Sequence, residues 1–132
     1  MSKYMTFTEI AFKDRALLVA ALEEIGCIEI QQGNALPLGR YYSEQTPQTA
    51  DVIVPRNTIG NAYGDIGFQR NEAGALTPII DDLDRARVMG GRFIPQLRLA
   101  YHERVVQTVA ARLRGTVHRT VEGGVIKLKV RY

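Results

Sequence analysis

Residues 62–81 decide the fold of this chain, and they read AYGDIGFQRNEAGALTPIID. Between Asp65 and Gln69, the apolar Ile66 and Phe68 alternate with polar residues and glycine. The segment NEAG at 71–74 interrupts this pattern, and residues 75–81 resume it. Two alternating runs joined by a few residues that include Asn and Gly are typical of a β-hairpin. The glycines do not form a phosphate loop, because their spacing is not GxxxxGK[ST] and no helix follows directly.

The segment before this hairpin predicts strand, helix and further strands. Residues 3–12 are rich in β-forming residues, and residues 13–26 (KDRALLVAALEEIG) form an amphipathic helix that starts near Asp14 and ends at Gly26. Its apolar positions recur at helical spacing and are Leu18, Ala21, Leu22 and Ile25. Residues 27–31 and 51–55 indicate strands, whereas 33–49 suggest a long loop or an irregular strand.

The segment after the hairpin predicts two helices and a second hairpin. Residues 81–91 suit a short helix, and 94–115 suit the main helix, with Pro95 in its first turn and an apolar arc of Leu99, His102, Val106, Val109, Ala110 and Leu113. Residues 116–132 predict a β-hairpin that turns at Gly123–Gly124 and pairs Val121 with Ile126 and Val117 with Val130. We expect Ile126, Leu128, Val130 and Tyr132 to face the core.

Length and composition predict one domain, residues 1–132. The chain is 45% hydrophobic and 23% charged, which is ordinary for a globular protein. The order of its elements predicts an α+β fold, a mainly antiparallel sheet covered by two main helices in a two-layer sandwich, with a C-terminal β-hairpin.

Composition also limits the cellular compartment and the classes of partner that we expect. Cys27 is the single cysteine, and no Cys/His spacing suggests zinc, so we expect a cytoplasmic protein with no metal and no cofactor. No apolar run approaches the ~20 residues that span a bilayer, and the N-terminus lacks the apolar block of a signal peptide. Residues 1–91 hold 8 Lys/Arg against 12 Asp/Glu, and residues 92–132 hold 9 against 2. An acidic partner, nucleic acid or another copy of the chain could match these two ends.

Candidate catalytic residues have a structural interpretation that we favour. His102 lies on the apolar arc, and Glu103 diverges from it by about 100° around a helix, so we expect a packed structural histidine. Asp65 and Arg70 lack a second titratable group nearby, and we expect solvent-facing strand charges. Cys27 has no recognisable nucleophile signature, which favours a buried thiol.

The basic C-terminal part raises the question of nucleic acid. Lys127, Lys129 and Arg131 form a cationic row on one strand face, while Arg98, Arg104, Arg112 and Arg114 do not share one face of a helix. Lysines on an edge strand also prevent aggregation, and no aromatic residues are interleaved with the row. We therefore favour a solvated or partner-binding face over a nucleic-acid site.

Several segments together resemble a known family. They are YGDIGFQRN (63–71), Gly74, Asp81, LRLAYHERVV (97–106) and EGGVIKLKVRY (122–132), and the likeness extends back to FKDRALLVAALEEIG (12–26). They resemble the hypothetical chloroplast reading frame thirty-five family, small proteins of plastids, cyanobacteria and other bacteria. Residues 71–81 depart from its more polar strand, and MGGRFIP (89–95) replaces a segment that often carries tryptophan.

The resemblance implies a role but no established enzymatic activity. Members are encoded near an AAA-type ATPase, which implies an accessory or adaptor protein. A shared site would lie at Asp65, Arg70, Asn71, Tyr101 and His102.

These observations favour a non-catalytic protein-interaction, adaptor or assembly module. Its candidate partners are an AAA-type ATPase or copies of itself, with no membrane. The first alternative is a nucleic-acid-binding protein that uses Lys127, Lys129 and Arg131. The second is a small enzyme or ligand-binding protein, which requires Asp65 and His102 to open into one apolar cleft.

Overall fold

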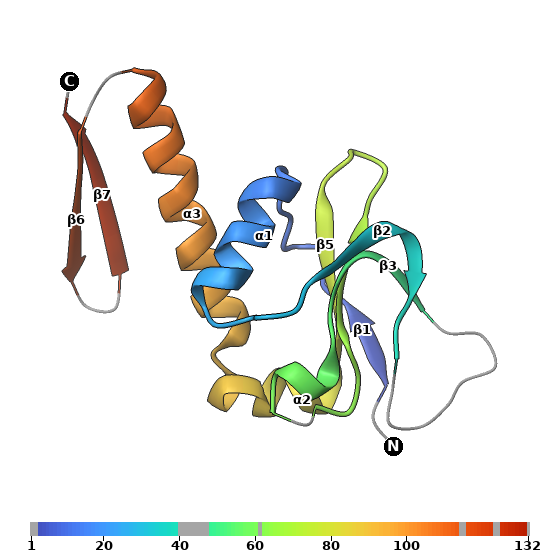
Figure 1. The fold of residues 1–132 in the computed structure, drawn as a ribbon. Helices are drawn as coiled ribbons and strands as arrows, with labels where there is room; N and C mark the ends of the chain where they lie inside the picture. The colour runs from blue at the N-terminus through green and yellow to red at the C-terminus, as the bar shows by residue number, and fades with distance from the viewer. Residues whose placement is uncertain (1–2, 40–47, 61, 114–115, 123–124, 132) are drawn as a thin grey trace.

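A computed structural model of the chain describes residues 3–39, 48–60, 62–113, 116–122 and 125–131. Over 116–131 it describes the backbone and, of the side chains, only that of Lys129. Figure 1 shows a sheet with helices beside it and a separate pair of strands near the C-terminus.

The main sheet is antiparallel throughout the described residues. Its five strands are ordered β1-β5-β4-β3-β2. They are β1 (Tyr4–Thr6), β2 (Gln31–Pro37), β3 (Thr49–Val54), β4 (Ile66–Arg70) and β5 (Leu76–Asp81). The expectation of an α+β protein built on an antiparallel sheet is therefore confirmed.

The hairpin predicted from residues 62–81 is formed by β4 and β5. Phe68 lies opposite Pro78 and Arg70 opposite Leu76. The Asn71 side chain accepts a 2.9 Å hydrogen bond from the Ala75 N–H, and the Asn71 N–H donates to the Ala75 carbonyl at 2.7 Å. Gly74 closes the turn with φ at +82°, a conformation that glycine adopts without strain. The turn chemistry in the sequence thus fixed the register of the two central strands.

The strand predicted at 27–31 is wrong in position. The Cys27 N–H donates to the Leu22 carbonyl at the end of the preceding helix, and residues 27–30 form no strand. Strand β2 begins instead at Gln31 and covers the first part of the segment 33–49, for which the sequence suggested a long loop or an irregular strand. Its pairing with β3 shifts between Gln32 and Leu36, and this bulge removes the strict alternation that sequence analysis relies on.

The helices lie close to their predicted positions. Helix α1 spans Arg15–Glu24, and the Asp14 side chain caps it by accepting a bond from the Leu17 N–H. Helix α2 spans Asp82–Arg87, and α3 spans Phe93–Arg112. Short 3-10 helices occupy Arg56–Thr58 (η1) and Val88–Gly91 (η2).

The main core lies between the sheet and the helices. Leu18, Ala21 and Leu22 of α1 are fully buried in one cluster with sheet residues and with the first half of α3. Phe12 connects the sheet to α3. Its ring contacts Phe68 edge-on at 5.8 Å and Tyr101 edge-on at 5.0 Å between ring centroids. A smaller cluster on the opposite face of the sheet contains Leu38, Ala50, Ile53 and Ile79.

Of the apolar arc predicted for α3, only Ala110 is buried. The buried residues are Phe93, Ile94, Leu97, Ala100, Tyr101 and Ala110, whereas Leu99, Val109 and Leu113 are exposed by 40 to 50% of their surface. His102 is exposed as well. Figure 1 shows that the C-terminal half of α3 extends past the sheet, and Val109 and Leu113 belong to this end of the helix.

Strands β6 (Thr116–Glu122) and β7 (Val125–Arg131) form a separate two-stranded antiparallel sheet beside α3 (Figure 1). Val117 pairs with Val130, and Val121 pairs with Ile126. The turn expected at Gly123–Gly124 lies outside the described residues, as do the side chains of Ile126, Leu128, Val130 and Tyr132.

Candidate functional site: a trough along α3

One side of α3 carries a stripe of residues that are exposed or partly buried. Arg98, His102, Val105, Val109 and Arg112 follow one another at intervals of four, three, four and three residues, which places them on one side of a helix. From Arg98 to Arg112 the stripe is about 21 Å long at 1.5 Å per residue. Two hollows lie along it, and both are lined by His102. We call the two together the α3 trough.

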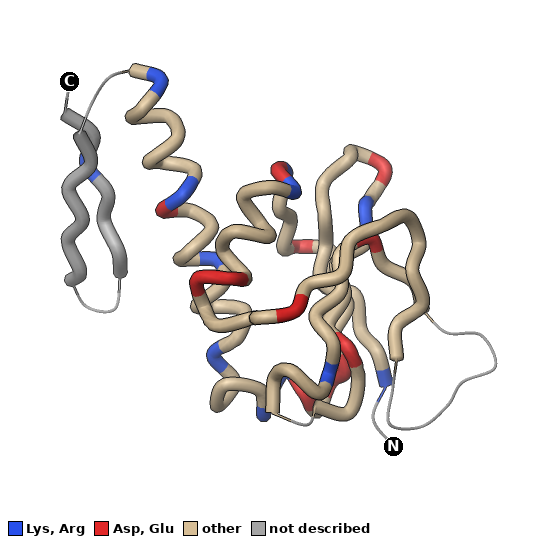
Figure 2. Tube along the Cα trace, in the orientation of Figure 1, with Lys and Arg blue, Asp and Glu red and all other residues tan. Residues whose placement is uncertain are grey.

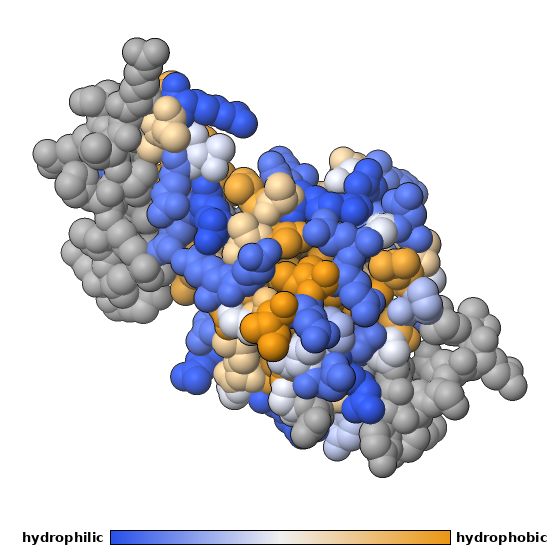
Figure 3. All heavy atoms as spheres, viewed as in Figure 1, coloured by the Kyte–Doolittle hydropathy of each residue, from blue (hydrophilic) through white to orange (hydrophobic). Residues whose placement is uncertain are grey.

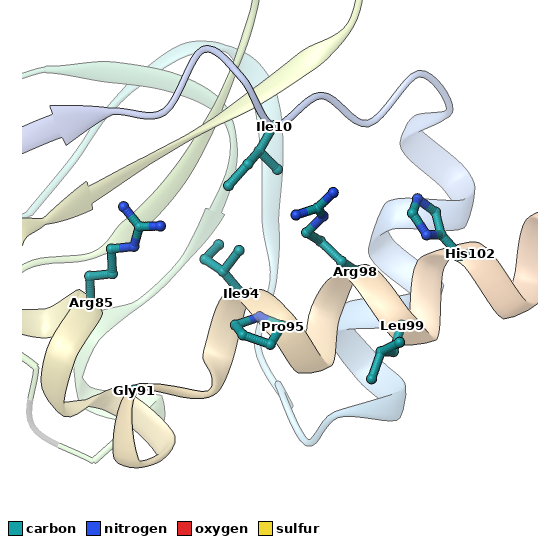
Figure 4. A pocket seen from close by; sticks show the side chains of 8 residues that line it. All are labelled: Ile10, Arg85, Gly91, Ile94, Pro95, Arg98, Leu99 and His102. Atoms are coloured by element: carbon teal, nitrogen blue, oxygen red, sulfur yellow. The ribbon is translucent and has the colours of Figure 1, made fainter. Parts of the chain in front are cut away.

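The first hollow, the cationic pocket, has a volume of about 470 Å³. Its lining residues are Ile10, Arg85, Gly91, Ile94, Pro95, Arg98, Leu99 and His102. Figure 4 shows Arg85 projecting from α2, and Arg98 and His102 from α3, toward the same side, with Ile10 facing Ile94. The pocket therefore combines cationic groups with a buried aliphatic wall.

The charges of the cationic pocket are not balanced from within. No Asp or Glu is among the described residues that line it. The Arg85 guanidinium lies 4.0 Å from the centre of the Phe7 ring, a cation–π contact that leaves its N–H groups available. In the described part of the chain, neither Arg85 nor Arg98 has a carboxylate within salt-bridge distance. Figure 2 shows basic residues along α3 and in α2, and it shows acidic residues in α2 as well, where Asp82 and Asp84 lie in the first turn.

The second hollow, the apolar groove, has a volume of about 420 Å³ and lies between α3 and the start of α1. Its lining residues are Ala11, Lys13, Asp14, Leu17, Tyr101, His102, Val105, Thr108, Val109 and Arg112. Leu17 and Val105 are partly buried against the core, and Val109 is 43% exposed. The groove thus has an aliphatic floor with Lys13 and Arg112 in its lining.

Hydrogen bonds hold the wall of the apolar groove. The Tyr101 hydroxyl accepts a 3.0 Å bond from the Asp14 N–H, and the Asp14 carboxylate accepts a bond from the Leu17 N–H. Asp14 is the only acid in the groove lining among the described residues, and its carboxylate already caps α1. The groove consequently presents mainly aliphatic and cationic groups to a partner.

Asp65, predicted as a site residue, serves the fold. Its two carboxylate oxygens accept bonds from the Gly39 N–H at 2.6 Å and the Arg56 N–H at 2.8 Å. Its own carbonyl accepts a bond from the Tyr4 hydroxyl at 3.0 Å. Asp65 therefore ties the start of β4 to the chain after β2 and after β3.

Arg70 and Asn71 also make local contacts. Arg70 lies 3.7 Å from the carboxylate of Asp51, which Arg15 approaches at 3.4 Å, and Asn71 caps the β4–β5 turn. The buried Asp51 further accepts a bond from the Ala35 N–H at 2.9 Å. These residues hold β2, β3, β4 and α1 together, and none of them lines the α3 trough.

The structure brings Tyr101 and His102 together but leaves Asp65 apart. Asp65 lines neither hollow of the trough, so it does not share the cleft with His102 that the enzyme hypothesis requires. The expectation of a packed His102 is wrong, because His102 is exposed and the neighbouring Tyr101 is the buried residue, at 6% exposure. Adjacent residues diverge by about 100° around a helix, so an arc drawn one residue off reverses the two roles.

Sequence analysis missed Lys13, Arg85, Arg98 and Arg112 as residues of one site. Around α3, Arg98 and Arg112 share a side with His102, whereas Arg104 lies elsewhere around the helix and Arg114 lies outside the described residues. The spacing from Arg98 through His102 to Arg112 would have shown the stripe. Lys129 is exposed, and the side chains of Lys127 and Arg131 lie outside the described residues, so the predicted cationic row stays a prediction.

Comparisons of this chain with models of protein families, with curated proteins and with solved structures found no match. Membership of the reading frame thirty-five family thus stays a prediction. Within the described residues, no three His, Cys, Asp or Glu side chains gather as metal ligands, and none of the helices combines the length and apolar character of a membrane span.

Proposed function

We propose that this chain is a non-catalytic interaction module that binds an acidic, amphipathic segment of a protein partner in the α3 trough. The observation that carries the proposal is the composition of the apolar groove. Leu17, Val105 and Val109 supply an aliphatic floor, and the one described acid in the lining, Asp14, is engaged by α1.

Charge and surface chemistry select the partner. Aliphatic side chains of a bound segment would remove Val109 from water, which is favourable by roughly 25 cal/mol for each Å² buried. Carboxylates of the same segment would meet Lys13 and Arg112. A basic segment would instead bring like charges together, which disfavours binding. An extended segment of about five residues would cover the roughly 15 Å of the apolar groove between His102 and Arg112.

The resemblance and the charges of the chain each give one candidate partner. An AAA-type ATPase is one candidate, and the module would then act as its accessory or adaptor protein. A second copy is the other, since residues 1–91 carry four more acids than bases and residues 92–132 carry seven more bases than acids. Either partner could supply an acidic segment to the trough.

We also infer the finer architecture that the site needs. α1 and α3 form the second layer of a two-layer sandwich, which is supported by the core cluster that both helices share with the sheet. The last two strands form a β-hairpin that turns at Gly123–Gly124, which is supported by the pairing of Val121 with Ile126.

Fluorescence anisotropy with labelled peptides tests the proposal. The probe is a peptide of about twelve residues that alternates Glu and Leu, and the control peptide replaces Glu by Lys. We expect saturable binding of the Glu peptide only, and a loss of about tenfold in affinity for Val109→Asp, which places a charge on the groove floor. Equal binding of both peptides would contradict the proposal.

A matched control variant distinguishes peptide binding in the groove from nonspecific hydrophobic binding elsewhere on the surface. Figure 3 shows hydrophobic side chains at the surface near the centre of the molecule, and Ile28, in the segment between α1 and β2, is 83% exposed. Ile28→Asp makes the same type of change outside the trough and should leave peptide affinity unchanged. If Ile28→Asp weakens binding as much as Val109→Asp does, the trough is not the site.

Light scattering behind size-exclusion chromatography, at low and high salt, detects self-association.

A nucleic-acid role is the second candidate, because Lys129 is exposed on β7. It predicts binding of a generic DNA or RNA that falls steeply with salt. Replacement of Lys127, Lys129 and Arg131 by Gln should then abolish nucleic-acid binding and leave the Glu peptide bound. No loss of nucleic-acid binding in this variant would exclude the row as its site.

A further inference from the structure

The hydrogen-bond donors of the cationic pocket lie in a row and do not converge on a single point. In Figure 4, Arg98 lies between Arg85 and His102, and Ile94 projects between the two arginines. Arg98 and His102 are one helical turn apart, about 6 Å along the axis. Donors spaced in this way match an anion whose charge is spread over two linked groups better than they match a single carboxylate.

Guanidinium groups and the N-terminal ends of helices both favour phosphate oxygens. An arginine can present two parallel N–H donors to a phosphate, and Arg85 and Arg98 come from different helices and point to the same side. Gly91, Ile94 and Pro95 place the N-terminal end of α3 at the pocket, where the helix dipole adds a partial positive charge. With no described acid in the lining, these contributions act together.

The pocket also has room for an organic group. Its volume of about 470 Å³ lies within the range of small-molecule sites, roughly 300 to 1,000 Å³. Ile10 and Ile94 are buried and face each other across it, so an apolar or aromatic ring would find an aliphatic wall beside the charges.

We propose that the cationic pocket binds a small molecule that carries a diphosphate group, with Arg85 and Arg98 on the phosphates and His102 as a further donor. The organic part of the ligand lies against Ile10, Ile94 and Pro95. This site goes beyond the peptide-binding function and shares only His102 with the apolar groove.

Isothermal titration calorimetry on the full chain, at constant ionic strength, tests this site with orthophosphate, inorganic diphosphate and ADP as probes. Diphosphate should bind at least about tenfold more tightly than orthophosphate, because it reaches both arginines. ADP should bind more tightly than diphosphate. No binding of diphosphate or ADP would overturn the proposal, and ADP no tighter than diphosphate would overturn the organic part of the ligand.

Variants locate the site. Arg98→Gln should weaken diphosphate binding by about tenfold or more, and Arg112→Gln, with the same loss of charge in the apolar groove, should leave it within about twofold. Equal losses in the two variants would mean a general effect of charge and would overturn the proposal. The Arg98 side chain is exposed and makes no hydrogen bond to described residues, so the Arg98→Gln variant should melt at the parent temperature. Arg85→Lys keeps the cation over Phe7 but loses the planar fork, and it should weaken binding without unfolding the chain.

The two proposals fail separately. Val109→Asp should lose the Glu–Leu peptide and keep diphosphate, because Val109 lines only the groove. Arg98 lines only the cationic pocket, so Arg98→Gln should weaken diphosphate binding more than peptide binding. A chain that binds diphosphate but no acidic peptide would sustain this inference and contradict the peptide-binding function.

Discussion

The hydroxyl oxygen of Tyr101 accepts a hydrogen bond of 3.0 Å from the backbone N–H of Asp14. Asp14 is the N-cap of α1, and Tyr101 is a buried residue of α3, 87 positions later in the chain. One hydrogen bond thus fixes where α1 begins relative to α3. Because both residues line the apolar groove, the same bond sets the shape of its wall.

Tyr101→Phe tests this link. The change keeps the ring that packs against Phe12 and removes only the acceptor, so the part-buried Asp14 N–H loses its partner. We expect a loss of about 1 kcal/mol in the free energy of unfolding, measured by urea denaturation, and weaker binding of the acidic peptide. Tyr63→Phe is the control, because the Tyr63 hydroxyl makes no hydrogen bond among the described residues. Equal effects of the two variants would show that the bond contributes nothing.

Replacement of Asp65 tests the assignment of that residue to the fold. Asp65→Ala leaves the N–H groups of Gly39 and Arg56 without their carboxylate and should lower the free energy of unfolding by about 2 to 3 kcal/mol. Asp65→Asn should cost less, since its amide oxygen can keep one bond. Glu72→Gln, an exposed change in the β4–β5 turn, should stay within about 0.5 kcal/mol. Diphosphate and peptide affinities of folded Asp65→Asn should equal those of the parent; a specific loss of binding would return Asp65 to the site.

The parts of the fold that sequence analysis predicted correctly have local signals. The α1 helix has apolar residues at helical spacing and Asp14 as its cap, and the β4–β5 hairpin has Asn71 and Gly74 in its turn. Strand β2 was misplaced because its bulge and the positive φ of Ala35 break the alternation that would identify it.

The candidate site had no local signal of this kind. Arg85, Arg98 and Ile10 come from three parts of the chain, and only the packing of α2 and α3 beside the segment after β1 brings them to one pocket. Periodicity could locate the α3 helix but not its buried face, because apolar residues such as Leu99 and Val109 lie on its exposed side. Tertiary packing therefore decided between Tyr101 and His102.

Gly67 lies against the smaller cluster of the sheet, where Ala50 and Leu38 leave little room for a side chain. A Cβ atom at this position would lie 2.7 Å from the Cβ of Ala50 and 2.8 Å from a methyl of Leu38. Gly67→Ala should therefore lower the free energy of unfolding by about 1 to 3 kcal/mol, although alanine suits a strand better than glycine does. Adding Ala50→Gly removes the closer contact and should recover part of the loss, as measured by urea denaturation. No recovery in the double variant would locate the strain elsewhere.

Burial of Cys27 predicts a dependence on pH. Burial raises the pKa of this thiol to about 11, whereas an unfolded chain ionises its cysteine near 8.5. The folded state keeps the proton in this range, so stability falls as the pH rises from about 8.5 toward 11. Between pH 8 and 10.5 the difference in free energy of unfolding between the parent and Cys27→Ala should shift by about 2 kcal/mol against the parent.

Alkylation of Cys27 by iodoacetamide gives an independent measurement. At pH 8 about one thiol in 1,000 is ionised in the folded chain, against roughly one in four in urea, and only the thiolate reacts. Mass spectrometry should therefore show labelling at least about a hundredfold slower in the folded protein. Labelling at similar rates in the two states would mean that Cys27 is accessible and ionised normally, and the stability difference should then not change with pH. Agreement of the two experiments would tie the effect to the thiol, because Cys27→Ala cannot be labelled and carries no proton to release.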